Sequence, residues 1–184
     1  AVGKGPLGIA VDGSGNVWVA NREDDNVTKL NPDGTIRGTF DVEEEPLYIV
    51  VDGFGNVWVT HGQSVTKIRT DGTTAVPFAV GGGPTGIAVD GSGNVWVTKG
   101  WDDNITKLNP DGTTVGTFDV GLGPEGIAVD GSGNVWVVNR YDGTVTKLNP
   151  DGGLLGSFVM SLGYKPTDIA VDSSGNVWVP RLIR

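Results

Sequence analysis

The sequence predicts an all-β fold made from a repeated four-stranded unit, and three observations support this prediction. The segment DGSGNVWV occurs at 12–19, 90–97 and 130–137, with near-copies at 52–59 and 172–179. The tryptophans of these five copies are 40, 38, 40 and 42 residues apart. The 31 glycines and 10 prolines fall at regular intervals between runs rich in β-branched residues, which indicates turns between strands rather than disorder.

Each unit contains four strand signals, expected in the first copy at 8–12, 16–20, 26–31 and 38–42. Asp-Gly-Ser-Gly separates the first two strands and Asn-Pro-Asp-Gly the last two, both typical of tight turns. Asp12, Ser14 and Asn16 also resemble the start of a calcium-binding EF-hand loop. That loop needs twelve residues and a final glutamate, whereas this stretch runs directly into a strand, so we predict a hairpin turn.

The second half of the unit recurs at 27–42, 65–80, 105–120 and 145–160, so the unit is present four times in full and once as its first half. Four antiparallel strands every 40 or so residues are typical of a β-propeller blade. We therefore predict a single propeller domain over residues 1–184 with five blade positions. Its units are 5–42, 43–80, 81–120, 121–160 and an incomplete, two-stranded 161–184. The five repeated tryptophans are expected to pack between blades.

The hairpin Asp-x-x-Gly-Asn-Val-Trp-Val followed by Val-Thr-Lys-Leu-Asn-Pro-Asp-Gly resembles NHL-repeat propellers, and more closely the streptogramin (virginiamycin B) lyase-like propellers. The resemblance covers essentially the whole chain. For an enzyme of that kind it implies a divalent metal with a histidine–glutamate–histidine group, which His61, the only histidine, cannot supply. A gluconolactonase-type propeller would hold calcium with Glu, Asn and Asp, and Asn21, Asn139, Glu45 and Glu125 match such a site only in part. We predict no enzyme activity, with a divergent metal-dependent enzyme as an alternative.

The charge and composition of the chain reduce the classes of partner that it is expected to bind. The formal net charge is −9, from 13 basic and 22 acidic residues, which disfavours nucleic acid and anionic membranes. No apolar run reaches the roughly 18 residues of a membrane span. The absence of cysteine excludes disulfides and thiolate chemistry. Because the chain begins at Ala1 rather than Met, we expect a processed product or a fragment. Separately, we expect the protein outside the cell, on its surface or in the periplasm.

The repeats differ from one another mainly in two connections. These are the loop between the second and third strands and the segment that leads into each unit. Both emerge at the same end of a four-stranded meander, so the variable residues share one face, where propellers usually bind ligands. Trp101 and Tyr141 occupy equivalent loop positions and offer exposed rings. A polar residue directly follows each second strand, forming an expected collar of Asn21, His61, Lys99, Asn139 and Arg181.

We therefore predict a non-catalytic binding or scaffold module whose variable face binds a glycan or a protein through these seven residues. No cofactor is expected, although calcium or magnesium at Glu43, Glu44 and Glu45 is a weak alternative. A second alternative is an assembly module. The apolar edge at 176–180 of the incomplete fifth blade would then pair with another chain or with a partner segment.

Overall fold

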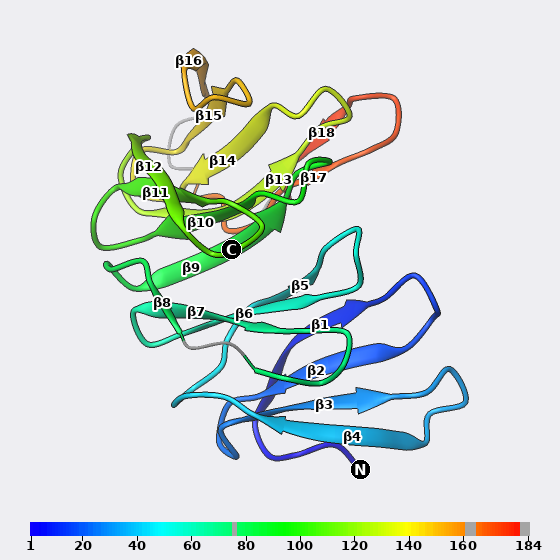
Figure 1. Ribbon diagram of the computed structural model, residues 1–184. Helices are drawn as coiled ribbons and strands as arrows, with labels where there is room; N and C mark the ends of the chain where they lie inside the picture. The colour runs from blue at the N-terminus through cyan, green and yellow to red at the C-terminus, as the bar shows by residue number, and fades with distance from the viewer. Residues whose placement is uncertain (75–76, 161–164, 181–184) are drawn as a thin grey trace. The chain divides into compact units, whose positions relative to one another are not determined.

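The computed structural model describes residues 1–74, 77–160 and 165–180, and these contain strands and no helix (Figure 1). The all-β prediction is confirmed. The chain divides into two compact units, Ala1–Val80 and Gly81–Arg184, whose boundary coincides with that between the second and third predicted repeats. No membrane-spanning helix is found in the described part of the chain.

The first unit contains two four-stranded antiparallel sheets, each with its strands in sequence order. The first sheet consists of β1 (Pro6–Val11), β2 (Val17–Asn21), β3 (Asn26–Leu30) and β4 (Ile36–Asp41). The second sheet consists of β5 (Ile49–Val51), β6 (Val57–His61), β7 (Ser64–Ile68) and β8 (Phe78–Ala79). The strands of the first sheet lie within two residues of the predicted bounds.

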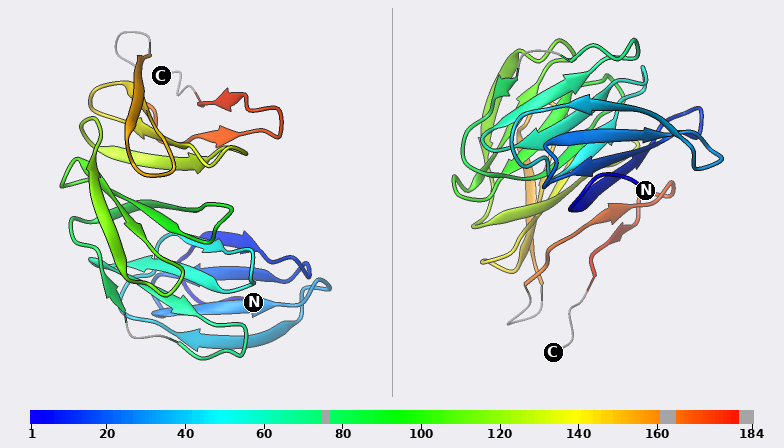
Figure 2. Two further views of the ribbon diagram at one scale, coloured as in Figure 1. Left: turned by 45° about the horizontal axis from the view of Figure 1, so that its top comes forward. Right: turned by 90° about the horizontal axis from the view of Figure 1, so that it is seen from below.

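The second unit contains two more four-stranded sheets and a two-stranded one (Figure 2). The third sheet consists of β9 (Pro84–Val89), β10 (Val95–Lys99), β11 (Asn104–Leu108) and β12 (Thr114–Asp119). The fourth consists of β13 (Pro124–Val129), β14 (Val135–Asn139), β15 (Thr144–Leu148) and β16 (Leu154–Val159). The fifth consists of β17 (Ala170–Val171) and β18 (Val177–Trp178), as expected for a unit that carries only the first half of the repeat.

The repeated Asp-Gly-Ser-Gly-Asn stretch is a hairpin turn organised by its aspartate. Asp12 Oδ1 accepts hydrogen bonds from the backbone N–H groups of Ser14 (3.0 Å) and Asn16 (2.9 Å), and Oδ2 accepts one from Trp18 Nε1 (3.1 Å). Gly15 supplies the positive φ of 80° that the turn requires. Burial acts against ionisation of Asp12, but the bonds from Asn16 and Trp18 outweigh it and hold its pKa well below the ordinary value. The predicted turn is confirmed.

A lysine from the third strand completes this arrangement in every four-stranded sheet. Lys29 Nζ lies 4.3 Å from the centre of the Trp18 ring and 3.4 Å from Asp12 Oδ2. The same cation–π contact recurs as Lys67 on Trp58, Lys107 on Trp96 and Lys147 on Trp136. We call this group the Asp–Trp–Lys cluster. It explains why the repeat keeps a lysine in the middle of Val-Thr-Lys-Leu.

Inside each unit, the tryptophan of one sheet packs against the next sheet. Trp18 contacts a cluster formed by Val57, Val59 and Ile68 of the second sheet. Trp96 does the same with Val135, Val137 and Leu148 of the fourth sheet. These tryptophans are 2% and 0% exposed, which confirms the interior position predicted for them.

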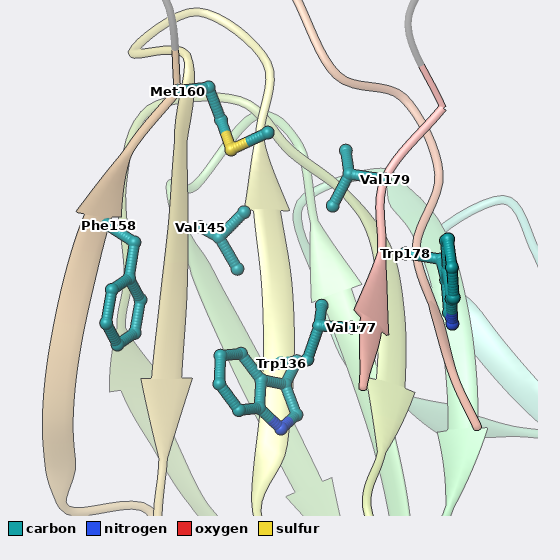
Figure 3. A pocket seen from close by; sticks show the side chains of 7 residues that line it. All are labelled: Trp136, Val145, Phe158, Met160, Val177, Trp178 and Val179. Carbon is teal, nitrogen blue, oxygen red and sulfur yellow. The ribbon is translucent and has the colours of Figure 1, made fainter. Parts of the chain in front are cut away.

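The prediction that all five repeated tryptophans are interior is wrong at the last copy. Trp178 is 63% exposed, and Trp136 is only half-buried. The two tryptophans are exposed for different reasons. The fifth sheet has two strands in the described residues, so it covers Trp136 incompletely, and no sheet of the described residues follows it to cover Trp178. An apolar hollow remains beside Trp136, with Val177 and Val179 on its other side (Figure 3).

Candidate functional site

The two variable connections lie at the same end of each sheet and hydrogen-bond to each other. In the first sheet, the N–H of Arg22 donates to the carbonyl of Gly5 at 2.9 Å. In the fourth, the N–H of Arg140 donates to the carbonyl of Gly123 at the same distance. The loop between the second and third strands and the segment that leads into the sheet therefore form one surface, as the strand order requires.

Several acidic loop residues hold this surface together through their side chains. Asp25 Oδ1 accepts from the N–H of Glu45 at 2.9 Å, and Asp103 Oδ1 accepts from the N–H of Gly123 at 2.8 Å. Each bond ties the loop of one sheet to the segment that leads into the next. Asp25 and Asp103 both adopt positive φ (52° and 55°), which aspartate tolerates better than most residues. Neither aspartate was among the predicted site residues. The signal for the positive φ at this position is the glycine at the matching place in the fourth sheet, Gly143.

The three consecutive glutamates have different partners. Glu45 Oε2 lies 3.0 Å from an Arg22 guanidinium nitrogen, and Glu43 Oε2 lies 3.6 Å from His61 Nδ1. Glu43 and Glu44 line a hollow of about 410 Å³ with Asp25, Val42, His61, Gly62 and Gln63. Among the described residues, no three His, Asp or Glu side chains are grouped so that they could hold a metal ion. The calcium or magnesium alternative at Glu43–Glu45 therefore gains no support from the geometry.

The residues predicted to form a polar collar are buried where the structure describes them. Asn21 donates from Nδ2 to Asn26 Oδ1 and Thr28 Oγ1, both at 2.8 Å. Asn139 donates in the same way to Thr144 and Thr146 at 2.9 and 2.8 Å. These bonds fasten the second strand to the third. Arg181 lies outside the described residues.

His61 and Lys99 are also engaged within their own sheets. His61 is 1% exposed, and its Nε2 lies 2.7 Å from Thr66 Oγ1. Burial lowers the pKa of His61 below its ordinary value of 6.5, although the Glu43 carboxylate acts in the opposite direction. Lys99 Nζ is buried and lies 3.4 Å from Asp102 Oδ2. The four described collar residues thus fix strand ends and loops rather than facing solvent.

The two loop aromatics are exposed and rest on glycine. Trp101 is 78% and Tyr141 is 68% exposed. A Cβ added to Gly83 would lie 2.9 Å from the Trp101 ring, and one added to Gly123 would overlap the Tyr141 ring. Both glycines have positive φ, 58° and 62°. Each ring therefore lies close against a peptide backbone that only glycine can provide, and much of its surface faces solvent.

The two rings belong to adjoining parts of the second unit. Asp103, two residues after Trp101, accepts the hydrogen bond from Gly123, the glycine beneath Tyr141. Thr85 Oγ1 also donates to the carbonyl of Pro124 at 2.6 Å. The loop that carries one ring thus fixes the backbone that supports the other. Trp101 and Tyr141 therefore lie exposed in the loops of adjacent sheets, whereas the four described collar residues are buried.

Comparison with solved structures identifies the architecture. A streptogramin B lyase structure is similar to 96% of this chain, with a TM-score of 0.88 and 23% sequence identity. Hydrazine synthase from Kuenenia stuttgartiensis is similar to 98%, with a TM-score of 0.90 and 18% identity. A gluconolactonase from Xanthomonas campestris is similar to 96%, with a TM-score of 0.71 and 20% identity. The chain has the β-propeller fold.

At these identities the similarity shows the fold and not the activity of the propeller. The chain spans 62% of the streptogramin B lyase chain, 56% of the hydrazine synthase chain and 69% of the gluconolactonase chain. No protein-family model matches the sequence, and comparison with curated proteins finds no match. Each four-stranded sheet corresponds to one blade, and the predicted resemblance to streptogramin lyase-like propellers is confirmed at the level of fold.

Proposed function

We propose that this propeller is a non-catalytic glycan-binding module, and that Trp101 and Tyr141 are the rings on which the sugar stacks. The observation that carries the proposal is the support beneath these rings. At equivalent loop positions in two successive blades, an exposed aromatic lies against a positive-φ glycine. A ring fixed in this way loses little conformational freedom on binding, which favours affinity.

The surroundings of the rings suit sugar hydroxyls. The Asp102 carboxylate is partly exposed beside Trp101 and pairs with Lys99. Arg140 and Glu125 form an ion pair at 2.6 Å beside Tyr141, and both side chains are partly exposed. These ion pairs offer hydrogen-bond donors and acceptors to sugar hydroxyls, and because their charges cancel they create no strong electrostatic potential of one sign. With a net charge of −9, the propeller should prefer neutral or cationic glycans to acidic ones.

Two features favour binding over catalysis. His61 is buried, and burial lowers its pKa, so it is neutral above its ordinary titration range and does not face the exposed surface. Asp25 and Asp103 of the variable loops accept backbone hydrogen bonds, and Glu45 and Glu125 pair with arginines. No group of three His, Asp or Glu side chains among the described residues could hold a metal ion. A general base or metal centre needs such groups directed at a substrate.

A glycan array with wild-type protein and three variants tests the proposal. Trp101→Ala and Tyr141→Ala should each weaken binding by about fivefold or more, since one stacked ring contributes about 1 kcal/mol or more. Phe54→Ala is the matched control. Phe54 is also an exposed aromatic, at 70%, but it lies in the Asp-Gly-Phe-Gly turn at the opposite strand ends.

Gly123→Ala is a sharper test, because it keeps both rings but leaves no room beneath Tyr141. It should reduce binding about as much as Tyr141→Ala. Binding should be the same with and without calcium. Folded wild-type protein that binds no glycan, or binding that survives loss of both rings, would contradict the proposal. Capture of a protein partner that needs the same rings would instead support the protein-binding alternative.

A further inference from the structure

A polar hollow of about 460 Å³ lies between the first and second sheets, at the strand ends opposite the variable loops. The turn residues Ser14, Phe54 and Thr70 line it, together with the basic side chains of Lys29 and Arg37. All five residues belong to the first compact unit of the chain. The hollow is therefore formed within one unit, by the turns of two neighbouring sheets.

Three of the residues that line the hollow depart from the repeat. Phe54 stands where the other four copies of its turn have serine, and Thr70 stands where the other three turns between third and fourth strands have proline. Arg37 stands where the fourth strands β12 and β16 have Val115 and Leu155. These positions lie in two turns and one strand of two different sheets, yet they meet at one place. Their convergence indicates a common role.

The corresponding junction of the second unit is crossed by a hydrogen bond that the first unit lacks. There, Lys107 Nζ donates to the carbonyl of Pro150 in the next sheet at 2.7 Å. The matching lysine of the first sheet, Lys29, lies 3.4 Å from Asp12 Oδ2 and forms no such bond to Thr70 among the described residues. Its ammonium group therefore keeps donor capacity for a ligand in the hollow.

The charges around the hollow leave one guanidinium without a partner. Asp12 and Asp52 each accept two backbone N–H bonds and one indole N–H bond inside their own turns. Lys29 pairs with Asp12. Arg37 is exposed, and its side chain forms no ion pair in the described part of the chain. A free guanidinium can bind a carboxylate through two parallel hydrogen bonds.

The second sheet adds an aromatic surface and a hydroxyl to this guanidinium. The Phe54 ring is 70% exposed, so its face is free to stack on a planar group. Thr70 Cγ2 would lie 3.3 Å from a Cβ on Gly55, much as the Pro32 ring would lie 3.5 Å from one on Gly15. The threonine methyl group thus takes the packing place of the proline, and its hydroxyl is the added polar group.

We propose that this hollow binds a small aromatic carboxylate, whose ring stacks on Phe54 and whose carboxylate pairs with Arg37. Lys29 and Thr70 supply further donors. The net charge of −9 opposes such an anion only weakly, because the potential of distant charges is screened over about 8 Å at physiological ionic strength. The inference does not rest on glycan binding. A neutral glycan offers no anion to Arg37, so Phe54→Ala stays a valid control for the glycan test.

Titration of the whole chain with 2-naphthoate, followed by amide chemical shifts in nuclear magnetic resonance, tests the proposal. The Phe54 and Thr70 amides should shift and saturate. The Ser132 and Asp151 amides, at the corresponding junction of the second unit, should not shift and serve as an internal control. 2-Naphthamide keeps the ring without the charge, and cyclohexanecarboxylate keeps the charge without a planar ring. Each should bind about fivefold more weakly or worse.

Variants that restore the repeat remove the site without disturbing the fold. Arg37→Val and Phe54→Ser should each weaken naphthoate binding about fivefold or more, and the combination with Thr70→Pro should abolish it. Lys4→Gln, which removes an exposed charge from the leading segment, is the control and should bind as wild type does. Urea unfolding establishes that each variant is folded.

Three results would overturn the proposal. The first is naphthoate that leaves the Phe54 and Thr70 amides unshifted. The second is equal affinity for naphthoate and either of the two other probes, which would show that charge and planar ring are not both required. The third is unchanged binding by the combined variant, or a loss in Lys4→Gln as large as that in Arg37→Val.

Discussion

Replacing Trp96 and Trp178 by alanine separates the two contributions that the repeated tryptophan makes to stability. Both indoles donate to the aspartate six residues earlier at 3.1 Å. Their packing differs. Trp96 is fully buried and lies against Phe118, with ring centres 5.7 Å apart. Trp178 is 63% exposed. The same substitution therefore removes the same local hydrogen bond from two very different environments.

The difference in burial sets the magnitude of the effect. A buried tryptophan removes about 150–250 Å² from water, worth about 4–6 kcal/mol at about 25 cal/mol per Å². Large-to-small core substitutions cost about 3–5 kcal/mol, and we expect this loss for Trp96→Ala. Only about a third of Trp178 is covered, so its burial contributes about 1–2 kcal/mol. Trp136, which is half-buried, should fall between the two.

Equilibrium unfolding in urea, followed by far-ultraviolet circular dichroism, measures these losses without relying on tryptophan fluorescence. Trp101→Ala, at a ring that is 78% exposed, serves as the control and should cost less than about 1 kcal/mol. Equal losses at Trp96 and Trp178 would show that the local hydrogen bond, and not packing between sheets, determines the contribution. That result would refute the role assigned to the inter-sheet clusters.

Three further substitutions test separate parts of the structure. The pKa of His61 is below 6.5 in the folded state, so as the pH falls the histidine of the unfolded chain is protonated first, and stability should fall as pH drops below 6.5. His61→Gln should remove this part of the pH dependence of the unfolding midpoint. Thr98 Oγ1 donates to the Glu125 carbonyl at 2.8 Å, and Thr98→Val should cost about 1–3 kcal/mol in urea unfolding by leaving that carbonyl without its donor. Asp103→Ala should cost about 1–2 kcal/mol through loss of the Gly123 bond and strain at positive φ, whereas Asp103→Asn, which keeps an acceptor, should stay close to wild type by the same assay.

Much of the fold could be predicted because the same turn and strand signals recur in every copy of the repeat. The turn residues, the alternating valines and the period of about 40 residues all indicate the same four-stranded sheet. The exposure of Trp178 could not be read from its local sequence, since that sequence is nearly identical to the copy around the buried Trp96. Burial of this ring depends on whether another sheet follows, which is a property of the assembly and not of the hairpin.

The candidate site could be predicted only where side chains project from the loops. Trp101 and Tyr141 occupy loop positions whose neighbours are glycines, so their exposure followed from the alignment of the repeats. The burial of the four described collar residues was not predicted, because a polar residue at the end of a strand can face either solvent or the next strand. Asn21 and Asn139 face threonines of the third strand, and those threonines were hidden in the Val-Thr-Lys-Leu motif.

The pairing of His61 with Glu43 explains why the only histidine of the sequence stands where it does. In the first and fourth sheets the last residue of the second strand is asparagine, and it packs under a glycine of the leading segment. A Cβ on Gly3 would lie 2.8 Å from Asn21. In the second sheet both positions differ at once, with Glu43 in place of the glycine and His61 in place of the asparagine, and the two side chains meet at 3.6 Å. A paired change at two contacting positions is what packing requires. His61 is accordingly held at both ring nitrogens, by Thr66 Oγ1 at Nε2 and by the Glu43 carboxylate of the leading segment at Nδ1.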